Sequence, residues 1–454
     1  MTKEIQELFN QRLGRVQAAM ALEPVDRVPI TFNTTYYAEK SSGYTYQQIM
    51  YDPAIWTKVE LDFAKKYPEI DTFRTNLTWA PAWDVLNHQL WKVPGRDIPP
   101  GSLQQFVEKE WMKADEYRMF IDDPIGYRMD VYFPRIIGEY KERGSIRSYA
   151  AFLKSGFVSG MVGAMNKERL SRLENEAGMP APCAGGFTAP FDYLADNYRG
   201  LHGITRDMFR QPENVIEACE ALLPDLVNKA RASADPQKRY PIFIATHKPC
   251  FMSPKQFDTF YWPTFKKGMM MLIDAGYTFR VFLEGDWSPH WHHLNEIPKG
   301  KLLCDVDNEA DIFEAKQAFG SQQFITGGMP TDMLILGSPE DIRKRVKLLC
   351  ETVGKYGGWG PNGGGHIPED TKPENFRALL DAVLEYGKYS DGPPPQPKSA
   401  PEPTADVKFP EPGVVTPWEV IKNENNWKIP GDEELIKKNW EMLERMAYNW
   451  ITSQ

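Results

Sequence analysis

The sequence is defined first by what it lacks. No run of about eighteen apolar residues occurs, so we expect no membrane-spanning helix. The 454 residues include only five cysteines, an odd and scattered set that favours a reduced, cytoplasmic compartment over a disulfide framework. The formal net charge is -9, so the chain lacks the basic face that a nucleic-acid-binding protein needs. Residues 1–20 form an amphipathic pattern without an apolar core, which is not typical of a signal peptide.

Several sequence motifs are absent as well. No GxGxxG opens a helix after the first expected strand, which argues against a dinucleotide-binding fold. The sequence has no HExxH and no CxxC pair, so the most specific zinc signatures are missing. The chemistry must therefore be inferred from where single residues stand relative to the strands.

What is present is an alternation of short apolar strands with long helical patterns. This alternation predicts a parallel sheet, and a strand count near eight favours a closed (β/α)8 TIM barrel over an open sheet. Ser338 and Pro339 illustrate the helix starts, because serine caps a helix and proline fits its first turn. The expected strands are 27–32, 71–76, 180–187, 240–247, 279–285, 301–306 and 323–328.

Two regions depart from this pattern. Residues 98–177 are polar and helix-rich, and we interpret them as a helical insertion into a barrel that spans 1–389. Residues 390–454 form a proline-rich linker followed by a tail helix with an apolar stripe at helical spacing. The tail helix either docks on its own barrel, which we favour, or clips onto a second subunit.

Polar side chains follow the ends of the apolar strands. Glu284 and Asp286 come directly after the strand at 279–285, and His247 and Cys250 follow the preceding strand. His366 follows three glycines, which allow a sharp turn and a close approach to another group. In a barrel enzyme the carboxyl ends of the strands carry the chemistry. Carboxylate, imidazole and thiol at one edge are the donor types that a zinc site uses.

Several of these residues have a purely structural alternative. Cys250 is as much a packing residue as a metal ligand. His290 and His293 share one face of a short helix, but an exposed first turn explains them better than a metal site. Asp305 and Asp307 fit helix caps. Glu284 resists such an explanation, because a carboxylate that ends an apolar strand needs a cation or hydrogen-bond donors.

The order of five segments resembles the uroporphyrinogen decarboxylase superfamily. The resemblance runs from about Glu23 to Tyr389, and it implies a (β/α)8 barrel with the site at the carboxyl ends of the strands. The segments are "EPVDRVPI", "CAGGFTAPFDYL", "MSPKQFDTFYWPTFKKG", "ITGGMPTDMLILGSPEDIRKRV" and "GGGHIPEDTKPENFRALLDAV".

The superfamily has two main branches, and the resemblance favours the second. True decarboxylases carry an arginine-rich segment after the first strand, whereas residues 31–45 contain no arginine and only Arg74 is near. The other branch comprises zinc methyltransferases that exchange methyl groups with a corrinoid cobalt. Their zinc ligands after the sixth strand and in the glycine-rich loop correspond to Glu284, Asp286 and His366 in this sequence, with Cys250 as a further candidate.

This change from sulfur to oxygen and nitrogen donors is similar to the branch that demethylates aryl ethers. Such donors leave more positive charge on zinc, which helps an ether oxygen to leave. The resemblance implies zinc, a corrinoid (cobalamin) that a partner protein carries, since no DxHxxG motif occurs, and a small-molecule substrate. It also allows a homodimer. The candidate substrate-binding residues are Tyr36, Tyr37, Trp79 and Asn362, although the aromatic ones serve equally well as barrel packing.

We therefore expect a corrinoid-dependent methyltransferase that acts on an oxygen-linked methyl group, with Glu284, Asp286 and His247 as catalytic candidates. Three alternatives remain. One is a metal-assisted lyase or decarboxylase without corrinoid, another is a methylcorrinoid:thiol methyltransferase, and the third is a non-catalytic scaffold whose tail helix binds a partner.

Overall fold

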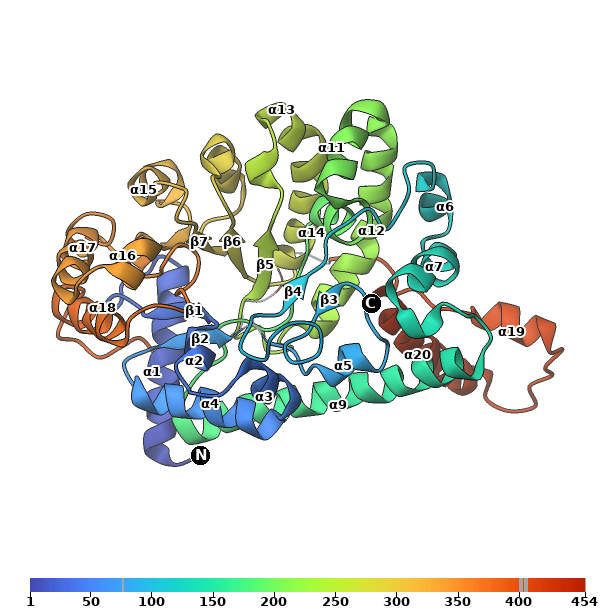
Figure 1. The fold of residues 1–454 in the computed structure, drawn as a ribbon, viewed down its shortest axis with the longest axis horizontal. Helices are drawn as coiled ribbons and strands as arrows, with labels where there is room; N and C mark the ends of the chain where they lie inside the picture. The colour runs from blue at the N-terminus through green and yellow to red at the C-terminus, as the bar shows by residue number, and fades with distance from the viewer. Residues whose placement is uncertain (76, 400–402, 404–406, 454) are drawn as a thin grey trace.

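A parallel sheet forms the centre of the molecule. The structure, a computed structural model, describes residues 1–75, 77–399, 403 and 407–453, and these form a mixed α/β fold (Figure 1). Two parallel strands, β1 Thr31–Thr35 and β2 Thr72–Thr75, pair with each other. A second sheet contains five parallel strands in sequence order: β5 Ile242–Thr246, β6 Phe279–Leu283, β7 Leu302–Val306, β8 Phe324–Thr326 and β9 Trp359–Gly360.

The predicted alternation and the parallel sheet are confirmed, but the sheet topology does not confirm a closed eight-stranded barrel. The two ladders meet through single contacts, such as the hydrogen bond from the Ile367 N–H to the Asn33 carbonyl. The predicted strand at 180–187 is wrong, because among the described residues it provides only one isolated bridge, from Gly186 to Phe243. Two prolines and Gly185, which has a φ of 73°, prevent a longer ladder there.

Long helices surround the sheet. In Figure 1, α9 runs along the lower edge, α15 and α17 lie on the left, and α12 and α14 lie on the upper right. The capping box of Ser338 and Asp341 starts α17, as the sequence predicts. A π-helical turn, Phe257–Tyr261, lies between the short helix α13, Pro254–Gln256, and α14. The longer helices are α1 Lys3–Met20, α4 Pro53–Lys66, α9 Ile146–Ala177, α11 Gly200–Arg210, α12 Pro212–Ser233, α14 Trp262–Asp274, α15 Ile312–Phe319, α17 Pro339–Glu351, α18 Pro373–Tyr386 and α20 Glu433–Ser453.

The region predicted as an insertion begins with a small antiparallel hairpin. Its strand β4, Gln105–Phe106, pairs with β3, Trp91–Lys92, and short helices then lead to α9. The boundaries of this insertion as a unit stay a prediction. Among the described helices, none is long and apolar enough to cross a membrane.

The end of the tail contacts the rest of the chain. The Trp450 ring packs against Phe133 and Phe152, and Ile451 is buried in the main core. The Tyr193 hydroxyl donates a hydrogen bond of 3.3 Å to the Thr452 carbonyl. Residues 400–402 and 404–406 of the predicted linker lie outside the described residues.

Candidate active site at the strand ends

One face of strand β6 and its end carries two charged side chains, Arg280 and Glu284, with Phe282 between them. Because side chains alternate along a strand, Arg280, Phe282 and Glu284 share the face opposite to that of the apolar residues between them. Arg280 is fully buried and pairs with the equally buried Asp305, with 2.7 Å between Nε and Oδ2. Glu284 stands where the strand ends, and its side chain is 45% exposed. The line therefore runs from a buried ion pair to an accessible carboxylate.

The buried carboxylate of Asp305 organises the interior below the strand ends. It accepts hydrogen bonds from Arg280, from the Thr326 hydroxyl at 2.5 Å and from the Asn362 amide at 3.2 Å. The Asn362 amide also donates to the Gly365 carbonyl at 3.1 Å. Asn362 thus holds the glycine-rich loop in place and is fully buried, and its predicted substrate contact stays a prediction.

The Gly-rich loop makes the close approach that its sequence predicts. Gly365 has a φ of 79°, which favours glycine, and a Cβ at this position would overlap the Phe282 ring. The loop places the half-buried His366 ring 6.5 Å from that of Phe282. Burial lowers the pKa of His366 against the raising effect of Asp307 and Asp305, so its imidazole is neutral near pH 7.

His247 is the centre of a group of ionisable side chains whose pKa values are shifted. Its Nδ1 lies 2.5 Å from Asp196 Oδ2, and its Nε2 lies 3.9 Å from Glu284 Oε2. Burial alone would lower the pKa of His247. The hydrogen bond with Asp196 and the charges of Asp192, Asp196 and Glu284 outweigh burial and raise this pKa to about 9. His247 is therefore a cation near pH 7.

Two aspartates, Asp192 and Asp196, hold this imidazole in place. Asp192 accepts hydrogen bonds from the backbone N–H groups of His247 and Lys248, at 3.1 and 3.0 Å. Burial raises the pKa of Asp192. Burial acts on Asp196 in the same direction, but His247 and Lys248 together lower the pKa of Asp196 below its usual value. Lys248 Nζ lies 2.6 Å from Asp196 Oδ1 and 2.8 Å from Glu108 Oε2.

Sequence reasoning missed Asp192, Asp196, Lys248 and Glu108. A signal for the aspartates was present, since they stand four residues apart in a segment that the superfamily resemblance includes. That spacing places two side chains on one face of a helical turn. Nothing local in the sequence indicates that Glu108 contacts the residue after His247.

Glu284 and Cys250 are both biased toward their neutral forms. Burial raises the pKa of Glu284, although the His247 cation opposes this. Burial and the charge of Glu284 raise the pKa of the Cys250 thiol to about 11. Cys250 lies against Gly285, where an added Cβ would come within 2.9 Å of Sγ. The thiol is therefore protonated near pH 7.

The four predicted metal ligands do not converge in this arrangement. Asp286 is exposed and accepts a hydrogen bond of 2.8 Å from the Ser288 N–H, which forms a local turn just before the short helix that follows. Within the described ranges, no three His, Cys, Asp or Glu side chains are placed to hold one metal ion. Glu284, Cys250 and His366 supply suitable donor types, but this geometry does not fit a formed zinc centre, and their role as ligands stays a prediction.

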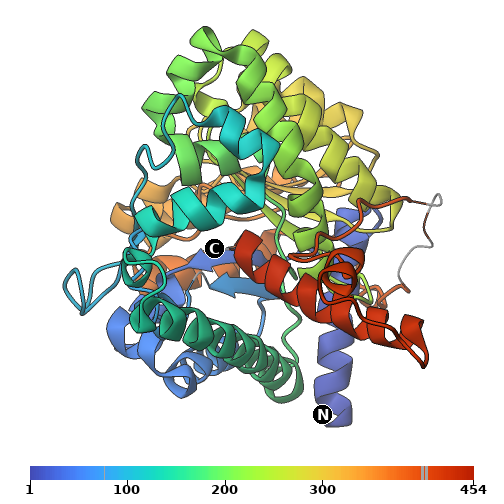
Figure 2. The same cartoon turned by 90° about the vertical axis from the view of Figure 1, so that its right-hand side faces the viewer.

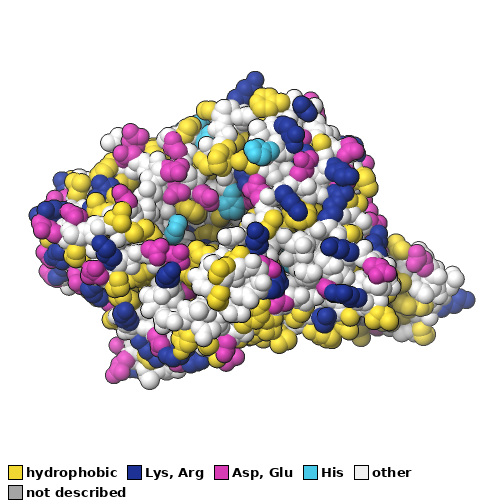
Figure 3. Space-filling view, in the orientation of Figure 1, with side chains coloured by type: hydrophobic (Ala, Val, Ile, Leu, Met, Phe, Trp, Pro, Cys, Tyr) yellow, Lys and Arg dark blue, Asp and Glu magenta, His cyan; other side chains and the backbone are white. Residues whose placement is uncertain are grey.

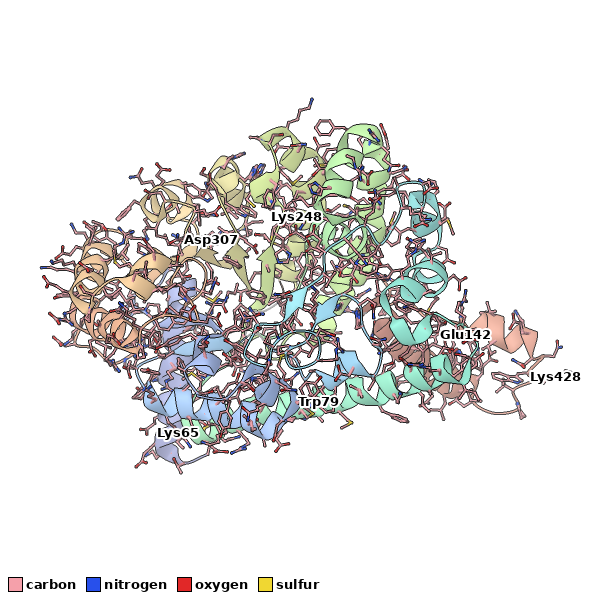
Figure 4. All side chains as sticks on the ribbon, viewed as in Figure 1. Lys65, Trp79, Glu142, Lys248, Asp307 and Lys428 are labelled. Atoms are coloured by element: carbon pink, nitrogen blue, oxygen red, sulfur yellow. The ribbon has the colours of Figure 1, made fainter. Side chains whose placement is uncertain are left out.

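The three aromatic residues predicted to bind substrate contact other aromatic rings or the backbone in this structure. Tyr37 is buried in the core, with its ring 4.7 Å from that of Phe376, while Tyr36 is half-buried and meets Tyr46 edge-on at 6.0 Å. Trp79 donates a hydrogen bond of 3.4 Å to the Tyr51 carbonyl. Figure 4 shows Trp79 beside α9, well below Lys248 and Asp307, which follow strands β5 and β7.

The expectation of an exposed first turn for His290 and His293 is wrong. Both are buried in the 3-10 helix Ser288–Glu296, which packs against the π-helical turn. The His290 ring stacks on Phe257 at 4.1 Å. His293 lies between two carboxylates, Asp258 and Glu296, each at 2.8 Å. These histidines therefore contribute to packing behind the strand ends.

The strand-end site, defined as His247, Cys250, Glu284, Asp307 and His366, opens on one face of the molecule. In Figure 3, histidine and acidic side chains gather around a hollow in the region of β5, β6 and β7. The site thus combines a held cation, a carboxyl of raised pKa and a neutral imidazole at an accessible position.

Comparisons with known proteins identify a family and a fold that this chain resembles. The model of the family described as uroporphyrinogen decarboxylase (URO-D) matches residues 165–386. A uroporphyrinogen decarboxylase from Pseudoalteromonas translucida (strain TAC 125) is 36% identical over 90 residues, which are 19% of this chain and 25% of that relative. The chain thus matches only about a quarter of the length of that relative.

A solved structure supports the same fold. A methyltransferase from Methanosarcina mazei superposes with a TM-score of 0.55 at 17% sequence identity, over 82% of this chain and 98% of that one. At this identity the likeness shows the fold alone. The family match covers residues 165–386, which include Asp196, His247 and Glu284, and it supports the resemblance to the uroporphyrinogen decarboxylase superfamily.

Proposed function

We propose that the protein is a methyltransferase that transfers a methyl group from an oxygen-linked substrate to the cobalt of a corrinoid carried by a partner protein. The observation that carries this proposal is the His247 cation, held by Asp196 beside Glu284 at the open strand ends. The methyltransferase from Methanosarcina mazei, whose fold this chain shares, supports the reaction class. We also propose that the two parallel sheets belong to one barrel, as in the predicted TIM architecture.

The chemical need for an acid explains the role of His247. When an ether loses its methyl group to a nucleophile, the carbon–oxygen bond breaks and its electron pair stays on the oxygen. That oxygen must then take up a proton to leave as an alcohol or phenol. The bound corrinoid would supply the nucleophile. His247 Nε2 faces Glu284 at the open side, so the imidazolium would donate the proton there.

Asp196 and Glu284 would tune this proton transfer. Asp196 binds Nδ1 and so directs Nε2, the other nitrogen of the ring, toward the site. Glu284 would stabilise the imidazolium when substrate is absent, because its charge is one of those that raise the pKa of His247. Because the predicted zinc ligands are not assembled in the described residues, no step is assigned to a metal.

The test combines the purified protein with free cob(I)alamin and methoxylated aromatic compounds. We expect methylcobalamin, followed by its absorption spectrum, and one phenol per methyl group transferred. His247→Gln should lower the rate by about 10²–10⁴-fold, the usual contribution of a general acid. His202→Gln is the matched control, because His202 is exposed on α11. Absence of methylcobalamin with every methoxy substrate, with and without a corrinoid protein, would contradict the proposal.

A decarboxylase or lyase without corrinoid is the second candidate. The Arg74 guanidinium lies 3.8 Å from the centre of the Phe243 ring. Phe243 is on β5, four residues before His247. A cation at that depth suits a substrate carboxylate. Release of CO2 from a carboxylated substrate would favour this reaction, whereas methylation of a thiol by methylcobalamin would favour the thiol methyltransferase.

A further inference from the structure

A cavity of about 420 Å³ lies beside helix α9, apart from the strand-end site. Its walls come from α5 Pro81–Asp84, the hairpin of β3 and β4, one face of α9 and the end of α20. Figure 2 shows that end of α20 on the same side of the molecule as α9. Small-molecule sites in proteins have volumes of about 300–1,000 Å³, and about 150 Å³ is enough for benzene. The cavity is therefore large enough for a ligand with one or two rings.

Aromatic rings form one wall of this cavity. Trp83 and Trp91 stack with their ring centres 4.6 Å apart and their planes at 8°. Phe106 meets Trp91 edge-on at 5.1 Å and is 36% exposed. The further apolar side chains in the lining include Leu86, Leu90, Val158, Val162 and Trp450. This wall suits the ring of a ligand, because aromatic pairs gain free energy beyond that of the area they bury.

A buried histidine offers an unused hydrogen-bond donor in the cavity lining. His88 is 6% exposed, and burial lowers its pKa to about 4, so its ring is neutral near pH 7. Its Nδ1 accepts a hydrogen bond of 3.3 Å from the Leu90 N–H, so the proton of the neutral ring is on Nε2. Within the described ranges, Nε2 has no hydrogen-bond partner. A buried donor of this kind costs free energy unless an acceptor in the cavity binds it.

The charge of the lining favours an anionic ligand. Lys229 of α12 lines the cavity and is exposed, so its ammonium group stands at the open side. It forms no ion pair with another described residue. Among the described residues around the cavity there is no Asp or Glu to compensate this charge. Positive charge beside an apolar wall attracts a ligand that carries an anionic group on an apolar body.

The cavity is separate from the strand-end site but lies against the same helical segment, residues 190–199. Tyr193 and Asn197 line the cavity. Asp192 and Asp196, the residues directly before them, hold the cationic histidine of the strand-end site. No side chain of the strand-end site is among those that line the cavity. A ligand in the cavity therefore leaves the strand ends open.

We propose that the cavity binds a planar aromatic carboxylate, a ligand with one or two fused rings and one anionic group. The rings pack against the wall of Trp83, Trp91 and Phe106. The carboxylate oxygens accept the His88 Nε2–H and pair with the Lys229 ammonium. The proposal concerns binding alone, so it does not depend on the proposed methyl transfer.

Titration calorimetry of the full chain with 2-naphthoate tests this site without any assay of activity. We expect one bound ligand per chain with a dissociation constant at or below about 1 mM, the affinity expected of so small a ligand. 2-Naphthalenemethanol has the same rings but no charge, whereas decalin-2-carboxylate has the charge but no flat aromatic ring. Each should bind about fivefold more weakly than 2-naphthoate.

Two substitutions in the lining make the test specific. Val158→Trp fills the cavity from α9 and should abolish binding. Leu153→Trp is the matched control, because Leu153 is 63% exposed on the same helix and lies outside the lining. Lys229→Gln should lower the affinity about fivefold, the usual effect of losing an exposed ion pair. Lys167→Gln, which replaces an exposed lysine of α9 outside the lining, should leave the affinity unchanged.

Circular dichroism checks the fold of each variant, and Val162→Phe repeats the filling if Val158→Trp does not fold. His247→Gln should bind 2-naphthoate as the wild type does, because His247 does not line the cavity. Absence of 2-naphthoate binding to the wild type would overturn the proposal, as would an unchanged affinity in a folded cavity-filling variant. Binding that is lost in His247→Gln and kept in Val158→Trp would also overturn it, in favour of a ligand at the strand ends.

Discussion

The substitution Asp196→Asn tests the charge state of His247 most directly. It keeps the shape of the side chain, removes its charge, and weakens the 2.5 Å hydrogen bond to Nδ1. A hydrogen bond to a charged group is worth about 1.5–3 kcal/mol, and one unit of pKa corresponds to about 1.36 kcal/mol. We therefore expect the pKa of His247 to fall from about 9 by roughly one to two units. The charges of Asp192 and Glu284 remain in the variant and still raise the pKa of His247.

The same substitution changes how stability depends on pH. A histidine whose pKa is higher in the folded state stabilises the fold fully below its unfolded pKa of about 6.5. That contribution is lost as the pH rises through about 9. The full shift would be worth about 3 kcal/mol, but the side chain is 39% exposed, so screening reduces this to about 1–2 kcal/mol.

Two measurements check this reasoning. Proton and nitrogen NMR of the imidazoles, with His247→Gln for assignment, gives the pKa of His247 in the wild type and in Asp196→Asn. Denaturant unfolding between pH 6 and pH 10 gives the free energy of unfolding. The wild type should lose its advantage over Asp196→Asn as the pH rises through that interval. An imidazole that titrates near its ordinary value in the wild type would refute the proposed cation.

Three further predictions follow from the structure. Asp305→Leu should destabilise the fold by about 3–5 kcal/mol in denaturant unfolding, because it leaves Arg280 buried without its partner, whereas Arg280→Met with Asp305→Leu should recover most of that loss. Metal analysis tests the predicted zinc ligands: one zinc per chain that is lost in Glu284→Gln would support them, whereas full activity of metal-free protein would contradict them. Deletion of residues 391–454 should leave a folded protein whose free energy of unfolding is lower by about 3 kcal/mol, because Ile451 is removed from the core. An insoluble product would show that the tail is required for folding.

The sequence predicts the strands best where burial is complete on both faces. Strands β5 to β8 appear within a few residues of the predicted positions, since parallel strands covered by helices read as continuous apolar runs. The segment 180–187 has a similar composition but does not form a strand, because its prolines and the left-handed Gly185 prevent a continuous ladder of hydrogen bonds. Closure of a barrel depends on how the first and last strands meet, and no local pattern specifies that.

Local sequence patterns predict the candidate site only in part as well. Strand-end position identifies His247, Glu284 and His366, because the carboxyl ends of parallel strands meet at one edge. The burial of His290 and His293 could not be predicted, since it depends on a π-helical turn against which their helix packs. Asp286, two residues from Glu284, accepts a local hydrogen bond from the Ser288 N–H, and its predicted role as a second ligand stays a prediction.

Glu284 and Asp305 differ in how completely their surroundings compensate the charge of the carboxylate. Both carboxylates belong to the same face of neighbouring strands. Asp305 meets a guanidinium, a hydroxyl and an amide, so its charge is fully compensated and fixed. Among the described residues, Glu284 has only His247 Nε2 as a charged partner within the ion-pair range, at 3.9 Å. An incompletely compensated carboxylate beside a protonated imidazole retains the capacity to bind a substrate atom or exchange a proton, and that capacity is what distinguishes the end of the strand from its middle.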